Sequence, residues 1–266
     1  MILEQIAEDT KIRVAEQRKK IPLGLLKKEA YKRNTETGFP FEQALKKEGL
    51  SFICEVKKAS PSKGVIAEDF PYLSIARAYE DAGADAVSCL TEPKYFLGSD
   101  QYLREIAEEI SIPVLRKDFV VEEYQIYEAK VLGADAVLLI CAILEPGILR
   151  RYIEVCDRLG LSALVEAHDK TEIAHALWAG ARIIGVNNRN LKDFSVDVGN
   201  STNLRELVPS EVLFVAESGI QNPQDIQVLK ENRVDAVLIG ETMMRSSNKK
   251  GMLQWLKGEN DTYEEG

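Results

Sequence analysis

Short apolar segments that end in a charged or amide side chain recur along the chain. In the first, residues 52–57, strand alternation places Ile53, Glu55 and Lys57 on one face. The segments 112–117, 161–166, 183–187 and 212–217 repeat this pattern and end in Lys117, Glu166, Asn187 and Glu217. Charge on a buried strand is costly unless the end of the strand opens onto a polar pocket. The pattern therefore predicts strands whose carboxyl ends meet at one polar mouth above an apolar floor.

A second pattern, a helix end followed by a tight turn and an apolar strand, returns about every 50 residues. Its four copies begin at Ala82, Leu132, Ala179 and Asn232. With the strands above, these repeats predict eight strand–helix units, the composition of a parallel (β/α)8 TIM barrel. Predicted helices fill the gaps at 99–110, 122–132, 145–159, 169–179, 201–207 and 222–232, and Asp69 is expected to cap another that reaches Glu80. The alternative, an open doubly wound sheet, lacks its G-x-G-x-x-G loop after the first strand.

The length of 266 residues suits a single α/β domain, because a barrel of this kind needs ~250. We expect residues 1–48 to form an N-terminal helical extension, 49–257 the eight strand–helix units, and 258–266 an acidic tail. Prolines and glycines divide the extension into two or three helices, which would pack across the bottom of the barrel or the rim of its mouth. A plain extension without such a role is the alternative.

Charge and composition narrow the choice of partners. The net charge of −9 argues against a nucleic-acid partner, and neither a signal peptide nor a run of ~20 apolar residues indicates a membrane. The four cysteines form no close pair, which is typical of buried thiols in a reducing cytoplasm. His168 is expected in a loop and His175 on the surface, because neither has a partner at metal-ligand spacing. We therefore expect a cytoplasmic protein without a metal site.

Two glycine-containing segments at the predicted mouth indicate an anion site. Ser218-Gly219 follows the seventh barrel strand, Gly240-Glu241 follows the eighth, and residues 241–245 are expected to form a short helix. Loops after these two strands form the common phosphate site of such barrels. Glycine lets backbone N–H groups approach phosphate oxygens, so we expect the backbone of Glu241 to face inward and its side chain outward. Each glycine taken alone would indicate only a turn.

Five charged side chains are expected to converge on the same cavity, those of Glu55, Lys57, Lys117, Glu166 and Glu217. Opposite charges keep each other ionised, whereas like charges and burial move pKa values toward neutrality. One pocket can therefore hold a proton donor and a proton acceptor at pH 7. Buried salt bridges are the alternative, but five charges at strand ends would be a costly source of stability. We favour acid–base catalysis.

Several motifs are similar to those of one known family. The segment at 52–66 reads Phe-Ile-Cys-Glu-Val-Lys-Lys-Ala-Ser-Pro-Ser-Lys-Gly-Val-Ile and resembles the signature of indole-3-glycerol-phosphate synthases. The resemblance continues at 115–119, 165–166, 186–191, 216–219 and 239–241. It implies a TIM barrel of the ribulose-phosphate-binding type and a carboxy-lyase of tryptophan biosynthesis. That enzyme closes the pyrrole ring of 1-(2-carboxyphenylamino)-1-deoxyribulose 5-phosphate, with loss of carbon dioxide and water. No cofactor is implied, and we expect the chain to act on this small phosphosugar-anthranilate molecule as a monomer.

The resemblance also implies roles for individual residues. Lys117 resembles the general acid that protonates the substrate carbonyl, and Glu166 the carboxylate that transfers a proton during dehydration. Lys57 resembles a residue that holds the substrate carboxylate or phosphate, or the dehydration acid itself, so the division of labour between Lys57 and Lys117 stays open. Glu55 and Asn187 resemble its orienting and hydrogen-bonding neighbours. The other implied contacts are Ser60, Arg189, Glu217 and Ser218, the apolar slot of Phe96, Phe119, Leu138 and Leu191, and the phosphate site of Gly219, Gly240 and Glu241.

Two alternatives remain open. Another phosphosugar barrel, such as phosphoribosylanthranilate isomerase, would share the phosphate glycines but should use a Cys/Asp pair, whereas Cys54 here faces away from Glu55 and Lys57. A barrel that only binds a phosphometabolite, or that supports a partner enzyme, is the second alternative. Fluorescence of indole-glycerol phosphate on mixing with substrate would distinguish them.

Overall fold

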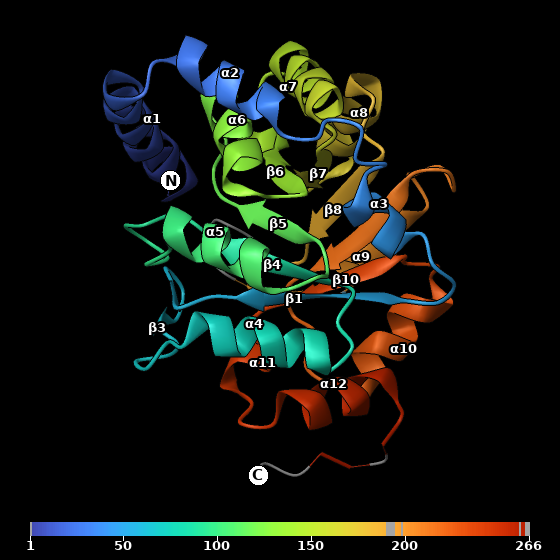
Figure 1. Cartoon of the computed structure of the whole chain (residues 1–266). Helices are drawn as coiled ribbons and strands as arrows, with labels where there is room; N and C mark the ends of the chain where they lie inside the picture. The colour runs from blue at the N-terminus through green and yellow to red at the C-terminus, as the bar shows by residue number, and fades with distance from the viewer. Residues whose placement is uncertain (1, 190–194, 198, 261, 264–266) are drawn as a thin grey trace.

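Eight parallel strands close into a barrel in the computed structural model, which describes residues 2–189, 195–197, 199–260 and 262–263 (Figure 1). The strands are β1 (Ser51–Val56), β4 (Ala86–Leu90), β5 (Val114–Lys117), β6 (Ala136–Ile140), β7 (Ser162–Ala167), β8 (Ile183–Asn187), β9 (Leu213–Glu217) and β10 (Ala236–Ile239). The first strand, β1, pairs with β4 on one side and with β10 on the other, which closes the ring. The predicted TIM barrel is confirmed, and the open-sheet alternative is wrong.

Helices cover the outside of the barrel and follow the strands in turn. They are α4 (Tyr72–Asp81), α5 (Asp100–Glu109), α6 (Glu123–Leu132), α7 (Pro146–Leu159), α8 (Lys170–Ala179), α9 (Gly199–Arg205), α10 (Pro223–Glu231), α11 (Glu241–Arg245) and α12 (Lys249–Lys257), with a 3-10 turn, η1 (Cys141–Ile143), after β6. Those from α5 to α10 agree with the predicted ranges to within two residues at each end. Among the described residues, no helix is long and apolar enough to cross a membrane.

Proline explains two of the element starts that differ from the prediction. The prediction that Asp69 caps a helix is wrong, because α4 begins at Tyr72 after Pro71, whose φ of −76° suits a helix start. No side chain caps that helix. Strand β5 begins at Val114 and not at residue 112, because Pro113 has no N–H group to donate to a neighbouring strand.

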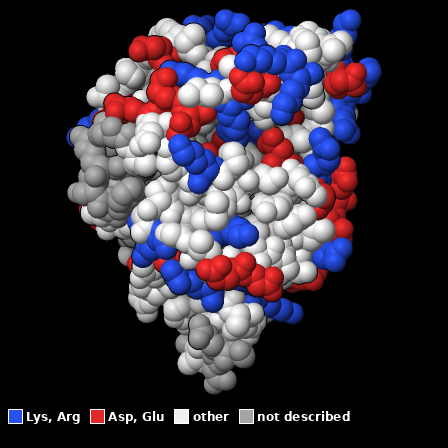
Figure 2. All heavy atoms as spheres, turned by 90° about the vertical axis from the view of Figure 1, so that its left-hand side faces the viewer, with Lys and Arg blue, Asp and Glu red and all other residues white. Residues whose placement is uncertain are grey.

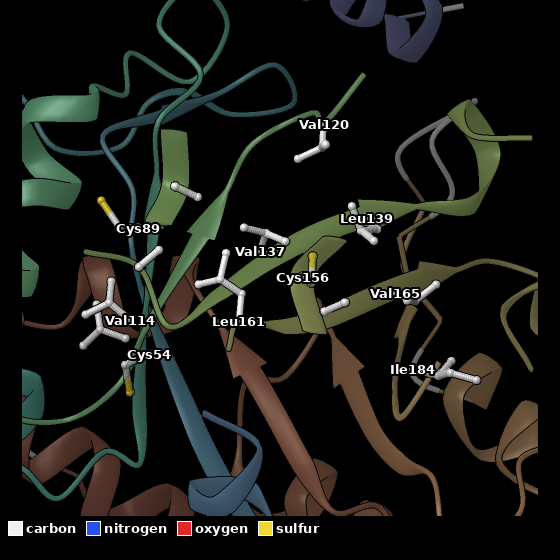
Figure 3. Packing of buried hydrophobic residues seen from close by; sticks show 14 of the residues in the cluster. Cys54, Cys89, Val114, Val120, Val137, Leu139, Cys156, Leu161, Val165 and Ile184 are labelled. Carbon is white, nitrogen blue, oxygen red and sulfur yellow. The ribbon is translucent and has the colours of Figure 1, made fainter. Parts of the chain in front are cut away.

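Strand side chains point alternately into the barrel and toward the helices. The inward-facing residues form one buried cluster that includes Ile53, Leu115, Leu138, Leu164 and Val215. Their chain neighbours pack outward against the helices in a second cluster, which Figure 3 shows with Cys54, Val137, Leu139 and Val165 among its members. The interior below the strand ends is therefore apolar, and Cys54 points away from it, as predicted.

The N-terminal helices α1 (Ile2–Lys20), α2 (Leu23–Lys32) and α3 (Pro40–Leu45) contact the barrel at different places. Phe41 and Leu45 of α3 belong to the interior cluster, and Ser51 Oγ at the start of β1 donates to the Ala44 carbonyl at 3.2 Å. Helix α3 therefore plugs the amino-terminal end of the barrel. At the other end, Arg13 of α1 donates to Asp118, directly after β5, at 2.8 Å. The N-terminal helices therefore occupy both predicted locations, the bottom of the barrel and the rim of its mouth.

Candidate active site

A cavity of 660 Å³ opens at the carboxyl ends of the strands. Side chains from the predicted strand ends line it, together with Ile2, Leu3 and Ile6 of α1. It is also bordered by the loop between β1 and α4, which contains the short strands β2 (Ala59–Ser60) and β3 (Gly64–Val65). Figure 2 shows the side of the molecule that carries α1 and this loop: acidic and basic side chains surround a largely uncharged central area.

Two lysines and three glutamates form the polar part of the cavity. Lys117 Nζ lies 3.6 Å from Glu166 Oε2 and 3.5 Å from Glu217 Oε2. Lys57 Nζ lies 2.7 Å from Glu55 Oε1. The glutamate side chains are buried, whereas Lys117 and Lys57 keep about 15% of their surface exposed. The lysines therefore lie between the buried carboxylates and the open cavity.

Burial and charge act in opposite directions on these groups. Burial alone would lower the pKa of Lys117, but the charges of Glu217, Glu166 and Glu55 outweigh it and raise that pKa above its ordinary value. Burial raises the pKa of Glu217 to about 7, even though the Lys117 charge opposes this. Burial would also raise the pKa of Glu55, but Lys57 and Lys117 hold it below its usual range. The cavity thus pairs charged lysines with one carboxyl group that titrates near neutrality.

The glycines after β9 and β10 lie beside these charges. Ser218 and Gly219 both have left-handed backbone angles, with φ of 68° and 83°. A Cβ at Gly240 would lie 2.5 Å from Glu55 Oε1 and 2.7 Å from Lys57 Nζ, so only glycine fits there without a shift. Helix α11 starts at the next residue, as predicted.

The carboxylate of Glu241 lies 3.0 Å from Arg245 Nε and 3.4 Å from Lys63 Nζ. Both cations come from the rim of the cavity, Lys63 from the loop that contains β2 and β3, and Arg245 from the last residue of α11. The glutamate is therefore neutralised beside the proposed anion site.

Aromatic and aliphatic side chains form another wall of the cavity. The rings of Phe96 and Phe119 lie 5.9 Å apart, and Leu138 of β6 also lines the cavity. Leu191, which was predicted to join them, lies outside the described residues. A flat apolar ring could rest against this wall, because aromatic side chains pack well against one another and against aliphatic groups.

Comparison with known proteins identifies the family. The family model described as indole-3-glycerol phosphate synthase matches residues 3–256. The chain belongs to the indole-3-glycerol phosphate synthase family. A relative of that name from Ruminiclostridium cellulolyticum is 57% identical over 258 residues, which cover 97% of this chain and 99% of the relative. Another from Lachnoclostridium phytofermentans is 52% identical over 268 residues, with coverage of 97% and 99%. The predicted activity, that of a decarboxylating lyase of tryptophan biosynthesis, is confirmed at the level of the indole-3-glycerol phosphate synthase family.

The similarity of this chain to solved structures supports its fold and nothing further. KGPDC from Streptococcus mutans has a TM-score of 0.62 at 10% identity and covers 79% of this chain and 96% of its own. Thiamine phosphate pyrophosphorylase from Pyrococcus furiosus has a TM-score of 0.58 at 16% identity, with coverage of 82% and 96%.

The cavity brings together every site residue that the resemblance to indole-3-glycerol phosphate synthases implied, apart from Leu191. Besides those already placed, Ser60, Asn187 and Arg189 line it. Among the described residues, no group of three or more His, Cys, Asp or Glu side chains could hold a metal ion.

Sequence reasoning missed two features of the site. It did not place Ile2, Leu3 and Ile6 over the cavity, because the position of α1 depends on contacts far away in the chain. It also left His168 as a loop residue, although its Nε2 lies 3.4 Å from Glu166 Oε1. The signal was available: His168 follows Glu166 by two positions, the spacing at which side chains share a face.

Proposed function

We propose that the cavity at the barrel mouth is where this chain converts 1-(2-carboxyphenylamino)-1-deoxyribulose 5-phosphate to indole-3-glycerol phosphate. One observation carries the proposal: the ammonium of Lys117 faces the cavity and is held between the carboxylates of Glu166 and Glu217. Such an ammonium can donate a proton to a substrate oxygen, and the carboxylates can accept one.

Ring closure needs an acid. The ring carbon that bears the carboxylate attacks the ketone carbon of the sugar chain, and negative charge develops on the ketone oxygen. We assign Lys117 as the acid that protonates this oxygen, because its charge is secured by three carboxylates. Loss of carbon dioxide then restores the aromatic ring, and the apolar wall favours expulsion of the charged group.

Dehydration needs an acid and a base together. The new hydroxyl group leaves as water after it takes up a proton, and a second proton leaves the ring system. Glu166 is the proposed base, since its Oε2 lies beside Lys117 at the cavity surface. Lys117, which regains a proton from solvent after the first step, or Lys57 supplies the proton to the hydroxyl group, and the proton that Glu166 accepts returns to the lysine that gave one.

The phosphate group would lie at the end of the cavity formed by Gly219 and Gly240. Lys57 Nζ lies close to Gly240, which supports a role for Lys57 at the phosphate and makes Lys117 the better candidate for the carbonyl acid. Glu55 keeps Lys57 in place through its contact of 2.7 Å. Backbone N–H groups near glycines bind phosphate oxygens in many barrels of this kind.

The anthranilate ring would lie against Phe96, Phe119 and Leu138, and we keep Leu191 as a proposed fourth member of this slot. Polar contacts to the sugar chain and the carboxylate would come from Ser60, Asn187, Arg189 and Ser218, all of which line the cavity. The substrate thus spans the cavity from an apolar wall to an anion site.

We also propose that the chain works as a monomer in the cytoplasm. The described residues of one chain supply the proposed acid, the proposed base and the anion site. The four cysteines are buried and free, which suits a reducing compartment.

Replacement of the proposed acid tests the function. Lys117→Ala should reduce kcat by at least about 100-fold, because a positioned general acid contributes that much. The KM should change less, and product formation can be followed by the fluorescence of the indole ring. Lys19→Ala, on the exposed side of α1, is the matched control and should keep the parent rate. A parent protein that binds substrate but forms no indole would favour the binding-only alternative, and an active Lys117→Ala variant would remove Lys117 from the mechanism.

A further inference from the structure

One imidazole lies next to the proposed base but outside the cavity wall. His168 follows β7 directly, and its side chain is 18% exposed. Its Nε2 lies 3.4 Å from Glu166 Oε1, while the other oxygen of Glu166 faces Lys117. The Nε2 atom is buried and makes no hydrogen bond with the described residues. The ring is therefore close enough to act on Glu166 by charge, without contact with the substrate space.

The opposite side of the ring is fixed by Glu172 in the first turn of α8. Glu172 Oε2 lies 3.1 Å from His168 Nδ1 and accepts the main-chain N–H of His168 at 2.8 Å. Helix α8 itself is held at its start by Asp169, whose side chain accepts from the N–H groups of Thr171 and Glu172. A proton on Nδ1 therefore points at Glu172, and Nε2 is left to face Glu166.

We propose that His168 is a positioning residue for the reaction: it holds the Glu166 carboxylate in its orientation toward Lys117 and places a positive charge behind it. This inference rests on the proposed function of the cavity, because it gives Glu166 the role of base. The four side chains form a row in the order Glu172, His168, Glu166 and Lys117, in which negative and positive charges alternate.

The charged groups around His168 are mostly acidic. Glu166 faces it from β7, Glu172 from α8, and Glu217 from β9, while Cys141 of η1 contacts the carbonyl of Glu172 through Sγ. Burial lowers the pKa of His168, but the hydrogen bond to Glu172 and the three carboxylates raise it to about 8. Burial raises the pKa of the Cys141 thiol to about 12, so it stays neutral. The imidazole therefore carries a proton at pH 7 and loses it above about pH 8.

The inference predicts a specific pH profile. As pH rises through about 8, His168 loses its charge and kcat should fall, whereas the raised pKa of Lys117 keeps the proposed acid charged. The KM should change little, because His168 does not line the cavity.

The test uses the full chain and compares kcat from pH 6 to pH 10 in three variants. His168→Ala should lower kcat by about 10- to 100-fold, as expected when a reacting group is poorly placed, and should lose the decline near pH 8. His168→Gln keeps an N–H donor but has no charge to lose, so its rate should lie between those of the parent and His168→Ala and show no decline near pH 8. His175→Ala, on the exposed face of α8, is the control and should match the parent in both respects.

A second measurement does not depend on activity. The chain contains two histidines, so His175→Ala leaves one imidazole whose titration can be followed by NMR. Its pKa should be about 8, and it should fall when Glu172→Gln is added. An ordinary pKa, or a His168→Ala variant with the parent rate and pH profile, would overturn the positioning role. An inactive parent would instead overturn the proposed function, which separates the two failures.

Discussion

Gly185 occupies a position on β8 where a side chain would collide with a proposed catalytic group. Within the sheet it is paired with Glu166 of β7 and Val215 of β9. A Cβ at this position would overlap Glu217 Oε1 and lie 3.2 Å from Leu164 Cδ1. The Gly185→Ala substitution therefore adds a single methyl group that must displace the Glu217 carboxylate.

The expected cost has two parts. Overpacking in a buried site costs about 1–3 kcal/mol of unfolding free energy. The displaced carboxylate also loses its position 3.5 Å from Lys117, and a misplacement of about 1 Å commonly costs about 100-fold in rate. Glu217 Oε1 makes no hydrogen bond with the described residues, so the carboxylate can move without breaking one there. We therefore expect the loss in kcat to exceed what the loss in stability alone would cause.

Two assays separate these parts: urea unfolding gives the free energy, and indole fluorescence at saturating substrate gives kcat. Gly24→Ala is the matched control, because Gly24 lies in α2 and a Cβ there would meet nothing within 4 Å. It should raise stability by up to about 1 kcal/mol and leave kcat unchanged. If Gly185→Ala keeps the parent kcat, the exact position of Glu217 does not matter for the reaction.

Two further predictions concern stability. Arg13→Met removes a cation from the fully buried Asp118 and should cost about 1–3 kcal/mol in urea unfolding at pH 7, whereas Lys11→Met, at an exposed ion pair, should cost less than about 0.5 kcal/mol. Burial alone would raise the pKa of Asp118, but Arg13 lowers it, so the contribution is present above about pH 4 and is lost as pH falls further; a loss that persists unchanged at pH 3 would contradict this. Burial raises the pKa of Glu217 to about 7, so its ionisation lowers stability as pH rises from 4.5 to about 7. Glu217→Gln should therefore gain about 1–3 kcal/mol relative to the parent between pH 5 and pH 8, and a constant difference between the two proteins would refute it.

The strand ends could be predicted because a period of two leaves few choices. Once Leu115 or Leu164 faces the interior, the residue two positions later must face the same way, and Lys117 and Glu166 therefore reach the mouth. The repeat of about 50 residues then predicted the number of units, and the glycines after the last two strands predicted where a phosphate would bind. The structure agrees with the predicted strand ends and with the closed barrel of eight strands.

Long-range contacts could not be predicted in this way. The bond between Arg13 and Asp118 joins residues 105 positions apart, and no periodicity encodes it. The position of α1 over the cavity rests on this contact and on others of the same kind, such as that of Arg18 with Glu122. The contacts of His168 are different, because Glu166 and Glu172 lie only two and four positions away from it in the sequence, so both contacts had a local signal.

The pairing of β1 with β10 has a consequence for synthesis on the ribosome. β1 is the first barrel strand to leave the ribosome, but it can pair with β10 only after the last barrel strand has been made. One edge of β1 therefore stays unpaired for most of translation. An unpaired strand edge invites association with other chains. Glu55 on β1 and Gly240 after β10 also come together only when the barrel closes. A nascent chain that stops before β10 would therefore be prone to association and would lack the proposed anion site.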